Sequence, residues 1–206
     1  MKEQLTVGSM FAGIGGICLA FRRNGCKIVW ANEIDKYACK TYRLNFGDEY
    51  LVEGDIQKID TKYIPEFDIL TAGFPCQAFS SVGLLEGFND PRGNLFFETA
   101  RVINKIKPRV VFLENVANLV KHDEGRTFDV ILKTLGDLGY YTVYKVMNAK
   151  EYGNIPQQRN RIYIVAFKYK KNVEKFEFPD MLQLTQTAFD LFDKKKQEEK
   201  SQYQYS

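Results

Sequence analysis

Histidine is almost absent from this 206-residue sequence, in which His122 is the single example. A Ser-His-Asp triad and a histidine-based metal site are therefore not expected, and catalysis would have to use other groups. Cysteine is scarce as well, and its spacing fits neither a CxxC motif nor a secreted disulfide scaffold. We expect reduced thiols and no bound metal. The four cysteines are Cys18, Cys26, Cys39 and Cys76.

Long apolar runs and a charge excess of one sign are also missing. The least polar stretch, residues 5–21, contains four glycines and no cleavage pattern follows it, so neither a membrane span nor a signal peptide is predicted. The 29 Lys+Arg and 26 Asp+Glu leave a net charge of +3, which is too small to predict a polyanionic partner. The remaining composition, 45% hydrophobic and 27% charged, is typical of one globular domain that folds without a disulfide or metal.

Short apolar runs alternate along the chain with segments of helical periodicity. This alternation predicts an α/β fold with a Rossmann-like, mostly parallel sheet and helices on both faces. No helical period separates the last two strands, so we expect them to form an antiparallel pair. The predicted strands are 5–10, 27–32, 67–72, 109–114, 140–147 and 161–167.

The pattern changes after residue 167. Residues 168–175 are a charged stretch, and residues 185–200 have the spacing of an amphipathic helix. We therefore predict a domain over residues 1–168, followed by a charged linker and helical tail over residues 169–206.

A glycine-rich turn, residues 11–16, directly follows the first predicted strand and precedes a helix. Glycines in this place let a ligand approach the backbone at a helix N-terminus, so a nucleotide-like cofactor is indicated. Cys18 occupies the position of the third glycine of the dinucleotide fingerprint, which disfavours a pyrophosphate ligand. Glu33, about twenty residues after Gly13, is placed to accept hydrogen bonds from ribose hydroxyls, and Asp55 offers a further polar group. The alternative is a tight turn followed by solvated acids.

Three further segments follow predicted strands or precede one. Cys76 lies in a Pro-containing loop beyond a parallel strand, where an exposed thiol can act as a nucleophile, although free cysteines are more often buried packing residues. Glu114 ends the next strand at the same sheet edge and could pair with a sulfur nucleophile as an acid, or be a surface carboxylate. Arg159 and Arg161 alternate toward one face before the final strand, which suits phosphates or a base edge, or simple solvation.

Taken in order, these segments resemble the motifs of the S-adenosylmethionine-dependent cytosine carbon-5 DNA methyltransferase family. The resemblance covers about residues 5–167 and implies a sheet of the class I methyltransferase type. The matching segments are 11–16 (FAGIGG), 32–35 (NEID), 54–56 (GDI), 73–77 (GFPCQ), 90–96 (DPRGNLF), 114–116 (ENV) and 157–161 (QQRNR).

The resemblance also implies individual roles. Cys76 would attack carbon 6 of a flipped-out cytosine, Glu114 would protonate ring nitrogen 3, and carbon 5 would take the methyl group. Arg159 and Arg161 would steady the base. The cofactor, converted to S-adenosylhomocysteine, would contact the adenine-stacking Phe11, Gly13 and Gly15 at the methionine end, the ribose-binding Glu33, the adenine-binding Asp55, and also Ile34, Ile56, Pro75 and Leu95.

The sequence departs from the family after residue 167. The variable target-recognition region and the last two motifs of the family are not found in residues 168–206. We therefore expect one subunit of a split, cytoplasmic enzyme of bacterial or phage restriction–modification, acting on double-stranded DNA with a second chain that carries recognition. The alternative to a split subunit is a truncated product of such an enzyme. The alternatives for the function are a tRNA cytosine-5 methyltransferase and a non-catalytic, cofactor-binding accessory subunit.

Overall fold

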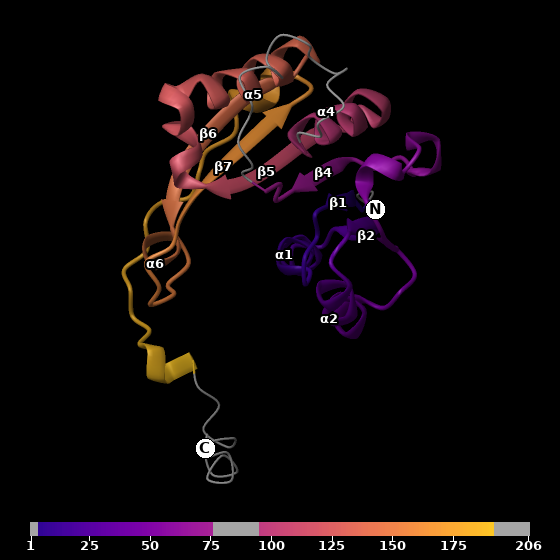
Figure 1. Cartoon of the computed structure of the whole chain (residues 1–206). Coiled ribbons are helices and arrows are strands. Elements are labelled where there is room, and N and C mark those ends of the chain that lie inside the picture. The colour runs from indigo at the N-terminus through magenta and orange to yellow at the C-terminus, as the bar shows by residue number, and fades with distance from the viewer. Residues whose placement is uncertain (1–3, 76–94, 192–206) are drawn as a thin grey trace.

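A computed structural model of the chain describes residues 4–75 and 95–191, and these form one seven-stranded sheet (Figure 1). The strand order is β3-β2-β1-β4-β5-β7-β6. Strands β1 to β5 are parallel to one another, whereas β7 runs antiparallel to both β5 and β6. The predicted Rossmann-like fold and antiparallel last pair are thus confirmed. The strands are β1 (Thr6–Met10), β2 (Lys27–Glu33), β3 (Leu51–Glu53), β4 (Ile69–Ala72), β5 (Val110–Val116), β6 (Tyr141–Asn148) and β7 (Asn160–Phe167).

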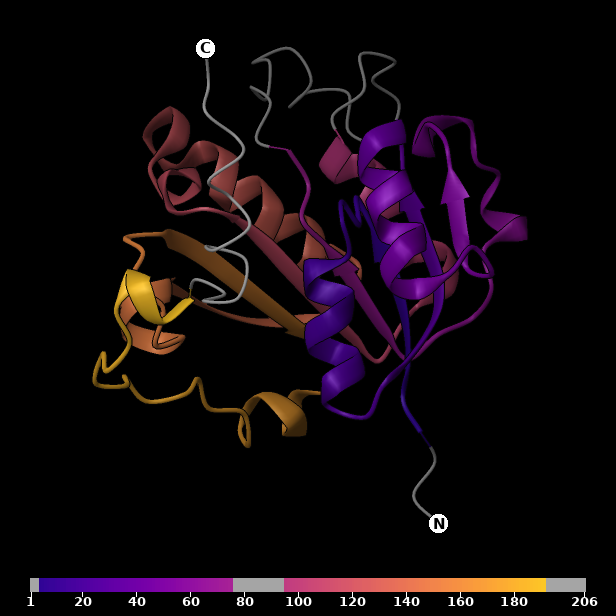
Figure 2. The ribbon, with the colours of Figure 1, turned by 90° about the horizontal axis from the view of Figure 1, so that it is seen from below.

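Helices cover both faces of the sheet, as Figures 1 and 2 show. On one face α1 and α2 bury Cys18, Cys39 and Tyr42 against the sheet. On the other, the amphipathic helices α4 and α5 contribute to a larger core around Phe96 and Ile131. The helices are α1 (Gly16–Arg23), α2 (Lys36–Phe46), α4 (Leu95–Ile106), α5 (Arg126–Asp137), α6 (Ala149–Tyr152) and α7 (Lys170–Val173).

Several short elements differ from the sequence-based expectations. Strand β3 was not among the predicted strands, because three residues are too few to show a period. The one-turn helix α6 lies in the loop between β6 and β7, and α7 lies in the charged linker.

The tail differs as well. No α-helix begins at Thr185 within residues 185–191, where a 3-10 turn, η6 (Ala188–Leu191), is found instead. Asp190 accepts hydrogen bonds from both the amide and the hydroxyl of Thr187, at 2.7 Å each, a pairing that places the start of the turn at Thr187 and not at Thr185. The rest of the predicted tail helix lies outside the described residues.

The thiols of Cys18 and Cys39 are free and buried, and that of Cys26 is half-buried. Burial raises the pKa of each of the three above its ordinary value, so they behave as small core side chains. Within residues 4–75 and 95–191, no cluster of three or more His, Cys, Asp or Glu suits a metal ion. Over the same residues, no helix has both the length and the apolar character needed to cross a membrane.

Candidate active site

The glycine-rich turn after β1 is built by positive backbone angles and one close contact. Gly13 and Gly15 have φ of 56° and 92°, values that favour glycine. A Cβ on Gly15 would also lie 2.3 Å from a ring carbon of Phe46 on α2. Around Gly13 a Cβ would meet nothing within 4 Å, so the conformation alone explains that residue. The shape of the turn thus explains Gly13, whereas Gly15 is needed both for this shape and for packing against α2.

Glu33, at the end of β2, holds this turn in place. One carboxylate oxygen accepts a hydrogen bond from the Gly13 amide at 2.8 Å. The other accepts from the amides of Ile34 and Asp35, at 2.8 and 2.9 Å. The Asp35 carboxylate in turn caps α2 by accepting from Tyr37 and Ala38. A carboxylate has about four acceptor sites, so three of those on Glu33 are occupied by backbone and about one remains for a ligand.

The turn after β3 is fixed from the neighbouring strand. The buried Asn32 donates its side-chain amide to the carbonyls of Val52 and Gly54, at 3.0 and 2.9 Å. Asp55 then caps the 3-10 helix η1 (Ile56–Lys58) by accepting from the Gln57 amide at 3.0 Å. The carboxylate of Asp55 is thereby held at the same sheet edge as that of Glu33.

These turns enclose a cavity of about 280 Å³ at the carboxyl ends of the parallel strands. Seven of the nine residues predicted to bind the cofactor line it. Gly13 and Gly15 are not in the lining, although the Gly13 amide bonds to the lining residue Glu33. Ile34 remains 63% exposed, so its apolar side chain is available to a ligand. The lining consists of Phe11, Asn32, Glu33, Ile34, Gly54, Asp55, Ile56, Gly73, Pro75 and Leu95.

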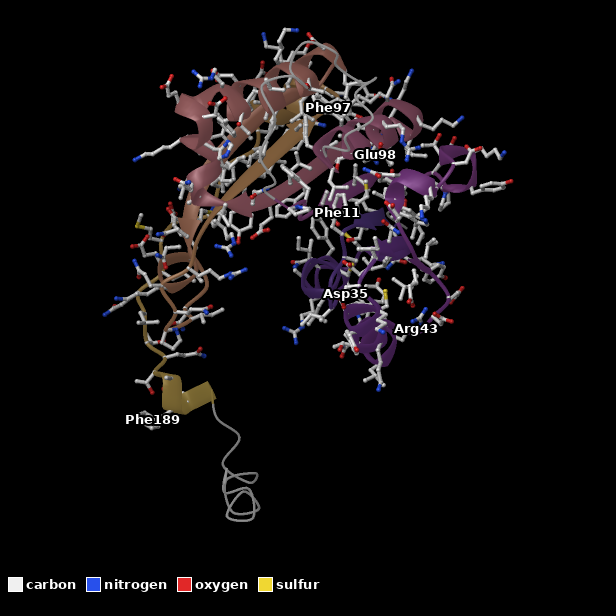
Figure 3. All side chains as sticks on the ribbon, viewed as in Figure 1. Phe11, Asp35, Arg43, Phe97, Glu98 and Phe189 are labelled. Atoms are coloured by element: carbon white, nitrogen blue, oxygen red, sulfur yellow. The ribbon has the colours of Figure 1, made fainter. Side chains whose placement is uncertain are left out.

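The chemistry of this lining suits a nucleoside. Phe11 supplies an aromatic ring, and aliphatic walls come from Ile34, Ile56 and Leu95. Two carboxylates, Glu33 and Asp55, provide acceptors for hydroxyl and amino groups. Figure 3 shows Phe11 and Asp35 on the side of the molecule where β1 and β2 end.

Beside the cavity, Glu114 and Arg161 form an ion pair between adjacent strands. Arg161 Nε lies 2.8 Å from a Glu114 carboxylate oxygen, and both side chains are about one-fifth exposed. The second carboxylate oxygen is 3.5 Å from where a Cβ on Gly73 would lie, and Gly73 also lines the cavity. The Glu114 side chain therefore lies at the same sheet edge as the cavity, and the Gly73 backbone lies between the two.

Arg159 lies just before β7 and not within it, and it is exposed. It still shares an electrostatic environment with the ion pair. Burial raises the pKa of Tyr163, which is paired opposite Glu114, and the Glu114 carboxylate raises it further. The charges of Arg159 and Arg161 act in the opposite direction. The two arginines and the glutamate thus all influence the hydroxyl of Tyr163, but of the two arginines only Arg161 is seen paired with Glu114.

Asn115, next to Glu114, connects this strand end to the loop after β4. Its buried side-chain amide donates to the Phe74 carbonyl at 2.8 Å, and its oxygen accepts from the Val116 amide at 2.8 Å. The backbone is thereby fixed two residues before Cys76, whose own position lies outside the described residues. No individual role was predicted for Asn115 or Asn32. A polar residue at the last buried position of an apolar strand was the available signal for both.

Comparisons with known proteins agree with this arrangement. A family model described as C-5 cytosine-specific DNA methylase matches residues 5–206. The chain is 49% identical over 191 residues to the Type II methyltransferase M.Bsp6I of Bacillus sp. (strain RFL6), covering 92% of this chain and 60% of that protein. It is 48% identical over 182 residues to the Type II methyltransferase M.HhaI of Haemophilus parahaemolyticus, covering 88% and 55%.

A solved structure supports the fold alone. The crystal structure of the S. pombe Dnmt2 methyltransferase is similar with a TM-score of 0.65 at 24% identity, covering 82% of this chain and 51% of that one. The chain spans little more than half the length of the curated relatives described above.

Proposed function

We propose, since this chain belongs to the C-5 cytosine-specific DNA methylase family, that it transfers a methyl group to carbon 5 of a cytosine in DNA. The observation that carries the proposal is the cavity with its two carboxylates, which adjoins the Glu114–Arg161 pair across Gly73. S-adenosylmethionine, when bound in this cavity, supplies the electrophilic methyl group. Phe11 would contact its adenine, Glu33 a ribose hydroxyl and Asp55 the adenine amino group.

The proposed reaction begins at Cys76. Its thiolate forms a bond to carbon 6 of the cytosine, and the displaced ring electrons reach nitrogen 3, which Glu114 protonates. Arg161 contacts the Glu114 carboxylate and, with Arg159, offsets the charge of this site. Carbon 5, now nucleophilic, would bond to the methyl group as the methyl–sulfonium bond of the cofactor breaks, which leaves S-adenosylhomocysteine, and nitrogen 3 would return its proton to Glu114. Carbon 5 would then lose its own proton to a base. The electron pair of the broken carbon 5–hydrogen bond re-forms the double bond between carbon 5 and carbon 6, and the sulfur of Cys76 leaves carbon 6.

A base stacked in a duplex exposes neither face to a thiol, so the cytosine is proposed to be flipped out, at a cost of a few kcal/mol. We also propose that a second chain supplies target recognition. Mixing the chain with a candidate recognition subunit and measuring methyl transfer would test it, and equal activity without that subunit would refute the dependence.

The catalytic proposal is tested with Cys76→Ser and the matched variant Cys26→Ser. DNA containing 5-fluorocytosine should trap wild type and Cys26→Ser covalently, and should not trap Cys76→Ser. Transfer from methyl-tritiated cofactor to DNA and to tRNA identifies the substrate. Trapping that survives in Cys76→Ser contradicts the mechanism, and labelling of tRNA alone contradicts the DNA substrate.

A further inference from the structure

Arg101, a partly buried residue of α4, makes more polar contacts than an ordinary surface arginine. Its guanidinium donates twice to one carboxylate oxygen of Glu98, at 2.8 and 2.6 Å. It also donates to the carbonyls of Ile59 and Ile56, at 3.1 and 2.9 Å. Both side chains of the pair are mostly buried, with 33% of Arg101 and 21% of Glu98 exposed. Geometry of this kind fixes an arginine more firmly than a single surface ion pair does.

The carbonyl acceptors belong to the segment that forms one wall of the cavity. Ile56 lines the cavity, and Asp55, which also lines it, caps the 3-10 helix that begins at Ile56. The backbone from residue 56 to residue 59 is short and lies at the surface between β3 and β4. Within it, the Ile59 amide bonds to the Ile56 carbonyl at 3.1 Å. The two guanidinium contacts therefore hold both ends of this turn.

The arginine itself belongs to the helix that forms another wall. Leu95, the first residue of α4, lines the same cavity, and Arg101 lies six residues later. Six residues of α-helix rise about 9 Å, so the contact is made less than two turns from Leu95. Arg101 thus joins the wall of Asp55 and Ile56 to the wall of Leu95 from outside the cavity, with no atom in the lining.

We propose that Arg101 is a positioning residue for the cofactor cavity, acting by keeping these two walls at a fixed separation. The inference rests on the proposed function, because it takes the cavity to be the S-adenosylmethionine site. A wall that is free to move lowers the fraction of chains in the binding-competent form, and the apparent affinity falls by the same factor.

Arg43 provides a matched control. Like Arg101 it is ion-paired, in this case with two acids, Asp48 at 2.6 Å and Glu53 at 2.7 Å, and its side chain is similarly exposed at 36%. It lies on α2, on the other face of the sheet from Glu98 (Figure 3), and neither it nor its partners line the cavity. Removing Arg43 therefore costs the same kind of ion pair without touching a cavity wall.

The test compares Arg101→Met and Arg43→Met in the full chain. Titration calorimetry with S-adenosylhomocysteine should give a Kd about tenfold higher for Arg101→Met, which is about 1.4 kcal/mol, and unchanged within twofold for Arg43→Met. Arg101→Lys keeps the charge, but one ammonium group does not replace the fork that bonds both carbonyls, so most of the loss should remain. Glu98→Gln keeps the carbonyl contacts and should lose less than threefold.

A second measurement needs no ligand. Hydrogen–deuterium exchange of a peptide covering residues 54–60 should be at least threefold faster in Arg101→Met than in wild type, and unchanged in Arg43→Met. Unchanged exchange there, or equal losses of affinity in both methionine variants, would overturn the role of Arg101. Wild type that binds no S-adenosylhomocysteine would instead contradict the proposed function, while the exchange result would still decide whether Arg101 holds the wall.

Discussion

Glu33→Gln should separate binding of the nucleoside from folding of the turn that surrounds it. The substitution keeps the shape of the side chain and removes its charge. In wild type, three backbone amides occupy the carboxylate at 2.8 to 2.9 Å, which leaves about one acceptor site for a ribose hydroxyl. A hydrogen bond to a charged group contributes about 1.5–3 kcal/mol, so its loss should raise the Kd for S-adenosylhomocysteine by roughly 10- to 150-fold.

The same substitution has a calculable effect on stability. The new amide group faces at least one backbone donor that it cannot satisfy, and an unsatisfied donor costs about 1–3 kcal/mol. That is less than the roughly 5–15 kcal/mol by which domains are usually stable, so the variant should fold.

Calorimetry and urea unfolding measure the two effects, with Glu53→Gln as control. Glu53 is an ion-paired glutamate at the end of β3 that does not line the cavity. A Kd for Glu33→Gln within twofold of wild type, or an equal loss in Glu53→Gln, would refute the role given to Glu33.

Three further predictions concern folding and the strand ends. Gly15→Ala should lower the free energy of unfolding by about 2–3 kcal/mol in urea titrations, because alanine disfavours the positive φ and its Cβ clashes with Phe46. An unchanged free energy of unfolding would contradict this packing argument. Asn115→Asp leaves the Phe74 carbonyl without its donor, so kcat with saturating cofactor and DNA should fall at least tenfold while the Kd for S-adenosylhomocysteine stays within threefold. A changed Kd with normal kcat would contradict this. Hydrogen bonds from Thr6 and the charge of Arg109 lower the pKa of Asp68, so its contribution to stability is present above the ordinary aspartate pKa and is lost as pH falls through the lowered value. Thermal unfolding of Asp68→Asn should therefore depend less on pH below about pH 4 than that of wild type, and parallel curves would exclude Asp68 as the cause.

The sheet could be predicted from sequence where strands were long enough to show their pattern. Residues 110–113 are apolar in succession, as a strand buried on both faces requires, and they form the centre of β5. Strand β3 has three residues and shows no period, so its place was indicated only by the polar turn that follows it. The tail over residues 185–191 has helical spacing, but only a 3-10 turn is found there, and it begins after Thr187, which pairs with Asp190.

The residues of the candidate site were likewise predictable only in part. Glu33 and Asp55, which line the cavity, could be predicted from residue type and from their spacing at strand ends. Asn32, Asn115 and Arg101 act on backbone carbonyls that lie 20 to 45 residues away in sequence. Such contacts depend on which strands are neighbours, and no local pattern of residues encodes them.

Gly73 leaves a single peptide backbone between the cavity and the Glu114 carboxylate. Under the proposed function, the methyl donor and the acceptor ring would then bind at adjoining places on this sheet edge. The methyl group would need no temporary attachment to the protein between donor and acceptor. The cofactor and the DNA would therefore have to be bound to the protein at the same time, in one ternary complex, before the transfer takes place.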